Sequence, residues 1–286
     1  MSRFPHNHQR AFDVACSLAG AGFVFPDFPI TSAALVGEHP GATSTEVNAA
    51  PRTVWSSTTS YVWPQTAHSI EVVSTSPNDT FGGTGANFVQ WIGLDADGYV
   101  AAPRVWALSG TTPSLMPGGT VWRTNGALCV AAGSGQVNTG NITFRIAGGG
   151  ATQAMIPAGT GGPAKRFIYT VPRDHFGVIG NWGIHLYEGN GASSQDQIAK
   201  VTQRIMPAGP ASAPVPGSNI WLDGISFSIN LKHGSQGLQP TPPPPALPPL
   251  TDIDARIVAV SSPGTVRVST AMNMMLVPAS FQLGGR

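Results

Sequence analysis

Short apolar runs recur along the chain from about Tyr61, and several of them alternate with polar residues. The clearest is residues 225–231 (ISFSINL), in which four aliphatic or aromatic residues alternate with Ser226, Ser228 and an asparagine. Residues 141–147 (NITFRIA) alternate in the same way. Because successive side chains of a strand point to opposite faces, this period of two predicts strands with one face on a core and the other on water or a polar partner.

Further strand candidates are rich in β-branched and aromatic residues and end at Gly, Pro, Asn or Asp turns. They are residues 69–75, 88–94, 105–108, 121–124, 127–132, 152–156, 166–172, 176–188, 253–260 and 265–277. Residues 176–188 are long enough for one strand with glycine kinks or for a hairpin turning at Asn181. The last two runs are expected to form a hairpin. This number of short strands predicts an all-β protein, a β-sandwich of jelly-roll type.

The pattern also predicts a division of the chain. Residues 1–60 are expected to form an N-terminal arm with one short helix at residues 8–18, either wrapped over a neighbouring subunit or capping its own domain. Residues 61–286 are expected to form one sandwich domain. Residues 234–250 hold seven prolines, which predict polyproline II or irregular backbone without a regular hydrogen-bond ladder. This segment is expected to be an insertion between strands rather than a domain linker.

Composition narrows the possible functions. Charged residues make up 10% of the chain, the net charge is +1, and Gly (35) and Pro (26) are frequent. No basic surplus is present to neutralise phosphates, so nucleic-acid binding is not expected. Low charge suits a subunit packed among copies of itself. No apolar run reaches membrane-spanning length, and Asp13 interrupts the signal-like N-terminal stretch. Cys16 and Cys129 do not imply a disulfide framework.

Few residues suggest chemistry. Asp95 and Asp97 resemble the start of a calcium loop, but the later ligands are missing, so a strand-connecting turn is the preferred interpretation. His6 and His8 lie near the N-terminus, and His175 follows an aspartate without a nucleophile-elbow pattern. The carboxylates form no pair suited to acid–base chemistry. We therefore nominate no catalytic, cofactor-binding or metal-binding residue, and the chain is not expected to be an enzyme.

The tryptophans allow two interpretations, a sugar-stacking platform or a hydrophobic core. Most of them lie within apolar runs that are typical of strands, which favours the core. They are Trp55, Trp63, Trp91, Trp106, Trp122, Trp182 and Trp221.

Several stretches resemble a group of structural proteins of tailed bacteriophages. They are residues 70–98 (IEVVSTSPNDTFGGTGANFVQWIGLDADG), 108–113, 121–149, 153–161 and 167–172, and the closing runs fit as well. The resemblance implies a virion β-sandwich protein located in the particle after assembly in the host cytoplasm. The expected function is a capsid decoration or cement protein that binds the major capsid protein and copies of itself. A glycan-binding tail, neck or fibre component is the alternative, and a polysaccharide-degrading enzyme is a third hypothesis.

Overall fold

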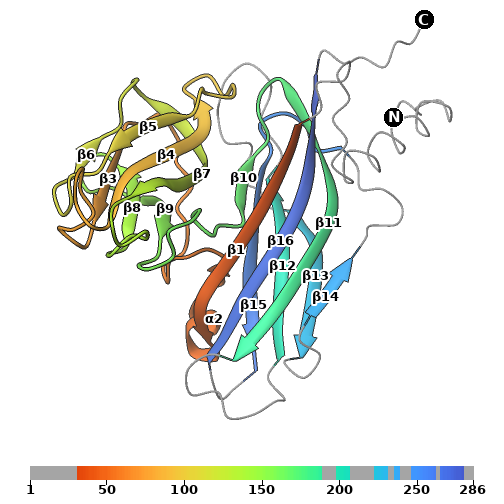
Figure 1. Ribbon diagram of the computed structural model, residues 1–286. Coiled ribbons are helices and arrows are strands. Elements are labelled where there is room, and N and C mark those ends of the chain that lie inside the picture. The colour runs from red at the N-terminus through yellow and green to blue at the C-terminus, as the bar shows by residue number, and fades with distance from the viewer. Residues whose placement is uncertain are drawn as a thin grey trace, which may run out of the picture.

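A computed structural model describes residues 31–188, 198–206, 222–230, 235–238, 246–261 and 265–279, almost all of which form strands and turns (Figure 1). The larger of two sandwiches is made by β1 (Thr31–Thr43), β2 (Arg52–Thr53), β10 (Ile168–Thr170), β11 (His175–Glu188), β12 (Ile198–Met206), β13 (Leu222–Asn230), β14 (Ser235–Leu238), β15 (Asp252–Val260) and β16 (Thr265–Pro278). The prediction of an all-β sandwich is confirmed.

The larger sandwich has jelly-roll topology. One sheet has the order β1-β16-β11-β14, and the other has the order β10-β15-β12-β13, with β2 also paired to β15. Counted along the chain without β2 and the strands of the smaller sandwich, these orders are 1-8-3-6 and 2-7-4-5. All ladders are antiparallel. Eight strands wound between two sheets in this order form a jelly roll.

The core of the jelly roll follows from the alternation of β16. Val266, Val268, Met272 and Met274 are buried, as the sequence pattern predicts. The expected hairpin of β15 and β16 is wrong, however. β15 pairs with β10, β12 and β2, whereas β16 pairs with β1 and β11, so the two consecutive strands lie in opposite sheets. Both are apolar on one face, and the core lies between them.

β11 is a single strand, which settles the choice that the sequence leaves open. It pairs with β16 from His175 to Glu188, and its register shifts once, between Ile179 and Trp182. Gly180 and Asn181 lie in this gap, so the predicted turn position is a bulge within the strand and not the end of a hairpin.

The observed arrangement differs from the division expected for residues 1–60. β1 is part of a jelly-roll sheet, because it pairs with β16 from Thr31↔Leu276 to Thr43↔Thr265. Its sequence, TSAALVGEHPGAT, shows no period of two, and its partner strand is more than 200 residues away in the chain. A six-residue helix, α2 (Ser44–Ala49), follows directly, with Thr43 and Glu46 forming a capping box. The helix expected at residues 8–18 lies outside the described residues.

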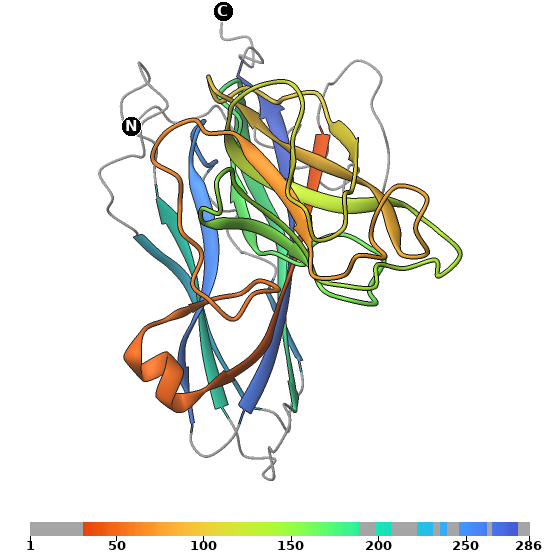
Figure 2. The same ribbon diagram turned by 90° about the vertical axis from the view of Figure 1, so that its left-hand side faces the viewer.

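A second, smaller sandwich is inserted between β2 and β10. Its sheets have the orders β6-β3-β8-β9 and β5-β4-β7. Its strands are β3 (Ile70–Ser74), β4 (Ala86–Asp95), β5 (Arg104–Ala107), β6 (Ser114–Leu115), β7 (Val121–Ala132), β8 (Ile142–Ile146) and β9 (Thr152–Ile156). It has its own core, which includes Ile70, Val89, Trp91 and Phe144. The expected single domain of residues 61–286 is thus divided between two sandwiches. Figure 1 shows this inserted sandwich beside the upper part of the jelly roll, and in Figure 2 it lies in front of that part.

The proline-rich stretch is partly regular. Ser235–Leu238 form β14, an edge strand paired with Trp182–His185, so the expectation of no ladder across residues 234–250 is wrong at its start. An edge position suits this strand because a proline tract can follow it without interrupting a central ladder. Leu247 is buried in the jelly-roll core. Residues 239–245, which hold most of the prolines, lie outside the described residues. No helix among the described residues is long and apolar enough to cross a membrane.

A buried histidine in β1 makes folding sensitive to pH. His39 is 2% exposed, and its Nδ1 atom accepts a hydrogen bond from the Gly41 amide at 3.2 Å. Burial lowers the pKa of His39 from 6.5 to about 4. The folded protein therefore keeps this imidazole neutral where the unfolded chain binds a proton.

We predict that the free energy of unfolding falls by about 3 kcal/mol between pH 6.5 and pH 4 because of His39. The sign follows from the lowered pKa, since the contribution is complete above the unfolded value and is lost as pH falls toward the folded value. Denaturant unfolding at a series of pH values measures it. His39→Gln, which keeps an acceptor for Gly41, should remove this part of the pH dependence. An unchanged slope in that variant would contradict the assignment.

Candidate functional site

A buried ion pair joins the two sandwiches. Arg123 lies on β7 of the inserted sandwich, and Asp252 begins β15 of the jelly roll. The guanidinium donates to both carboxylate oxygens, with Nε at 3.1 Å from Oδ1 and Nη2 at 2.9 Å from Oδ2. The two side chains are 0% and 1% exposed. Charge-assisted bidentate bonds of this kind have a fixed geometry, so the pair sets how β7 sits on β15.

Neighbouring groups hydrogen-bond and pack against this ion pair. The Thr170 hydroxyl donates to Asp252, and Nη1 of Arg123 donates to the Pro64 carbonyl at 2.5 Å. The Arg123 guanidinium also lies over the ring of Trp122, with 4.0 Å to the centroid. Burial raises the pKa of the Asp252 carboxyl, and the charge of Arg123 opposes that shift. Two buried charges stay favourable only when their remaining donors and acceptors are satisfied, as they are here.

Further hydrogen bonds extend the junction. The Asn125 side chain pairs with the Thr170 backbone in both directions, each bond being 3.0 Å long. Arg166, which is 4% exposed, donates to the Thr124 carbonyl and stacks near the ring of Tyr61, 5.3 Å from its centroid. Burial lowers the pKa of the Arg166 guanidinium. These bonds join β7 to β10 and to the segment before it, so the ion pair is not the sole connection that holds the two described sandwiches together.

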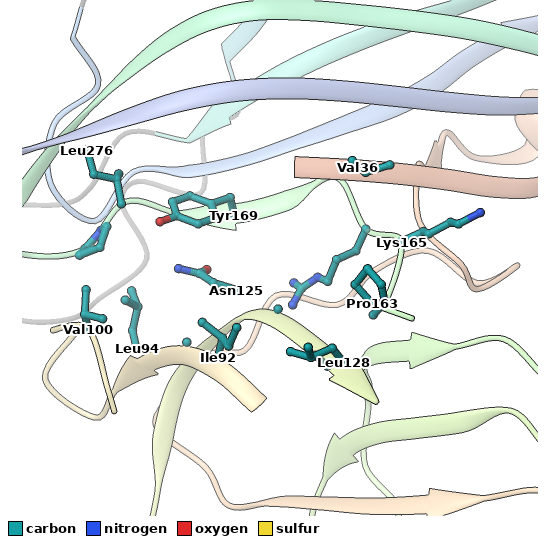
Figure 3. A pocket seen from close by; sticks show the side chains of 16 residues that line it. Val36, Ile92, Leu94, Val100, Asn125, Leu128, Pro163, Lys165, Tyr169 and Leu276 are labelled. Atoms are coloured by element: carbon teal, nitrogen blue, oxygen red, sulfur yellow. The ribbon is translucent and has the colours of Figure 1, made fainter. Parts of the chain in front are cut away.

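An apolar cleft of about 530 Å³ opens beside the junction. Figure 3 shows Val36, Tyr169 and Leu276 of the jelly roll on one side and side chains of the inserted sandwich on the other. The inserted side includes Ile92, Leu94, Val100 and Leu128. Burial raises the pKa of the Tyr169 hydroxyl. The volume is within the range of protein ligand sites, and most of the lining side chains are hydrophobic.

The cleft continues onto an exposed apolar surface, which we call the outer face. It is the side of sheet β5-β4-β7 that points away from the core of the inserted sandwich. Pairs across the sheet, such as Gln90 with Val105 and Leu128, place their side chains on this side. Its members are Phe88, Gln90, Ile92, Val105, Ala107, Leu128 and Val130. Ile92 is 38% exposed and Val105 48%, and none of the seven carries a charge. A contiguous apolar surface of this kind is typical of an interaction site.

Asp79 organises the loops at the far end of the inserted sandwich. It is fully buried, and its two oxygens accept hydrogen bonds from the amides of Ala86, Thr139 and Gly140, each at 2.8 Å, and from the Ser74 hydroxyl at 2.5 Å. The chain is close-packed here, because a Cβ on Gly85 would lie 2.1 Å from Asp79 Oδ1. One carboxylate therefore fixes the turn of residues 79–85.

The candidates considered from the sequence do not come together. The Asp95 carboxylate accepts hydrogen bonds from the amides of Asp97 and Tyr99, which is the geometry of the preferred turn interpretation. The His175 ring hydrogen-bonds Asp174 at 2.7 Å, and no bond from this ring to a serine is found in the described part of the chain. No group of three metal-ligating side chains is present among the described residues. His6 and His8 lie outside them.

The tryptophans belong to the cores, as the preferred interpretation predicts. Trp55, Trp63, Trp91, Trp106, Trp122 and Trp182 are all buried. Trp221 lies outside the described residues. The buried rings leave no aromatic platform built from these six.

Sequence reasoning missed the residues that shape the site. Arg123 and Asp252 are 129 positions apart, and Asp79 takes its partners from segments up to 61 residues away. No local pattern connects such groups. One signal was available, because the chain is poor in charge and an arginine within the apolar run VWRT therefore needs a buried partner.

Comparison with known proteins identifies no family for the chain. No protein-family model and no curated protein matches the chain. The chain shows weak structural similarity to viral capsid proteins. The solved structures include infectious bursal disease virus Gx strain (12% identity, 89% of this chain and 82% of that chain, TM-score 0.13), T=1 particles derived from that virus (10%, 90% and 82%, 0.13) and its VP2 subviral particle (11%, 90% and 85%, 0.11). None of these three is from a tailed phage, and at such TM-scores the similarity carries no argument.

We predict that removing either partner of the ion pair destabilises the protein by about 3–5 kcal/mol, because the other charge is left buried and unpaired. Arg123→Met and Asp252→Asn are the test variants, and chemical denaturation measures the loss. The double variant should lose less than the two single losses combined, by at least about 1 kcal/mol. Losses that simply add would show that the two side chains are not coupled.

We also predict that Asp79→Asn costs about 2–4 kcal/mol, because an amide cannot accept all four bonds that the carboxylate receives. Thermal and chemical unfolding measure this effect. Asp97→Asn is the matched control, since Asp97 is exposed and its substitution should stay within about 0.5 kcal/mol of the parent. Equal stability of the two variants would mean that Asp79 does not fix the turn.

Proposed function

We propose that the chain is a structural subunit of a virus particle and that it acts as a decoration or cement protein on the head of a tailed phage. The carrying observation is the strand order of the larger sandwich, 1-8-3-6 and 2-7-4-5. This jelly roll is the architecture of many viral capsid domains, although lectins and cupins also use it. The resemblance of residues 70–98 and later stretches to tailed-phage structural proteins supports the finer assignment.

The mechanism is mechanical. Two rigidly joined sandwiches present an uncharged outer face and an adjoining cleft, both suited to burial against other subunits. The major capsid protein and further copies of this chain are the proposed partners. Burial of apolar surface across the joints between them would stabilise the shell, and the location is the virion after assembly in the host cytoplasm.

No catalytic role is part of the proposal. A depolymerase needs two carboxyl groups facing a substrate cleft. The buried aspartates of the described residues are instead held by other protein groups: Asp252 by Arg123, Asp254 by Arg204, and Asp79 by backbone amides and a serine hydroxyl. The cleft lining holds no acidic side chain.

Fractionated particles of the virus that encodes this chain test the proposal. We expect mass spectrometry to find the chain in purified heads at a fixed ratio to the major capsid protein. Heads stripped of the chain should lose their contents at a lower temperature than intact heads, and adding the purified chain back should restore the difference. Recovery of the chain in tails alone would contradict the cement role, and its absence from all particles would contradict the structural role.

A further inference from the structure

One aromatic side chain is held out into solvent by a rigid turn. Phe81 is 69% exposed, the highest value among the large apolar side chains of the described residues. Its ring touches Phe88 of the outer face edge-on, with 5.5 Å between centroids. Exposed aromatic residues on preorganised backbone are the groups that most often dominate binding energy at protein interfaces.

Hydrogen bonds hold most backbone groups of the turn that presents Phe81. The Phe81 amide donates to Leu108 O at 3.1 Å, and the Gly82 amide donates to the Asn87 side chain at 2.8 Å. The same Asn87 amide group donates to the carbonyls of Gly83 and Gly85. Together with the buried Asp79 carboxylate, these bonds fix the direction of the ring before any partner arrives.

Phe81 does not line the cleft of its own molecule. Its ring lies beside Phe88 on the outer face and is 69% exposed, whereas Leu128 of the cleft lining pairs with Gln90, two positions along β4 from Phe88. A projecting apolar group and an apolar recess on one surface are both covered when a second molecule packs against that surface.

We propose that Phe81 of one copy inserts into the cleft of a second copy, with the outer face covered in the same contact. The choice of a second copy as occupant rests on the proposed function, which requires repeated subunits. Because Phe81, the outer face and the cleft lie on one continuous surface, two copies related by a two-fold axis can each place Phe81 in the cleft of the other.

Charge and size favour this occupant. The outer face has no charged member, and the two cations of the cleft lining are Lys165, which is paired with Glu38, and the buried Arg166. The combined surface therefore suits an apolar partner such as another copy of this chain, whose net charge is only +1. Of the 21 residues in the outer face and the cleft lining, 14 are exposed or half-buried. With Phe81 they form a contact at the small end of the range for protein interfaces, whereas Phe81 alone would be too small.

Sedimentation velocity of the purified full-length chain over a concentration series tests the contact. We expect the parent chain to associate, and Phe81→Ala and Val100→Glu each to weaken association at least about 30-fold, the effect of losing one interface hot spot. Val100 is 55% exposed in the cleft lining, and Val36→Glu is a second cleft variant. Leu115→Ala is the matched control, because Leu115 is 63% exposed on β6, in the opposite sheet.

Mixing the two defective variants is the sharper test. The Val100→Glu copy keeps its Phe81, and the Phe81→Ala copy keeps its cleft, so one intact contact should form and the mixture should give one-to-one dimers. Each variant is first checked for a parental thermal unfolding curve, so that loss of association reports the contact alone. A parent chain that stays monomeric, a Phe81→Ala variant that associates like the parent, or a mixture without dimers would each overturn the proposal.

The outcome is independent of the test of function. Association through Phe81 by a chain that never occurs in particles would support this contact and contradict the structural role. If the Phe81→Ala variant is incorporated into heads and associates like the parent chain, the structural role is supported and this contact is contradicted.

Discussion

The arrangement of the molecule depends on one buried ion pair, Arg123 with Asp252. Each charge lies on a different sandwich, and each would be costly to bury alone. Paired through two hydrogen bonds and closed off by Thr170 and Trp122, they make one relative placement of β7 and β15 far better than any other. Apolar packing alone tolerates sliding, whereas a bidentate pair does not. The cleft and its continuity with the outer face follow from that placement.

The inserted sandwich is held together by its own contacts although much of its outer face is exposed. Its core and the Asp79 network stabilise it as a separate unit. The part of its outer face formed by Ile92 and Leu128 lies opposite the jelly roll across the cleft, and the rest of that face remains available.

Sequence reasoning reached the fold where its signal is local. Residues 141–147 and 265–277 alternate, and Ile142, Phe144, Val266 and Val268 are buried as that pattern requires. It missed strands whose partner strands are far away in the chain and strands in which polar residues interrupt the alternation of apolar residues. β1 contains Gly, His and Pro, and β12 was not expected, because buried Gln203 stands at a core-facing position between Val201 and Ile205. The separation into two cores and the false hairpin share that cause, since sheet membership is set by partners far away in the chain. The junction could not be predicted for the same reason, since its two charges are 129 positions apart.

Cryo-electron microscopy of particles that contain this chain would show the junction within a subunit and the contacts between subunits in one map. We expect every copy to have the two sandwiches in one fixed relation, with continuous density between Arg123 and Asp252, and neighbouring copies to meet through the outer face and cleft. A map in which the inserted sandwich takes variable positions on the jelly roll, or in which the outer face and cleft remain exposed to solvent, would contradict this expectation.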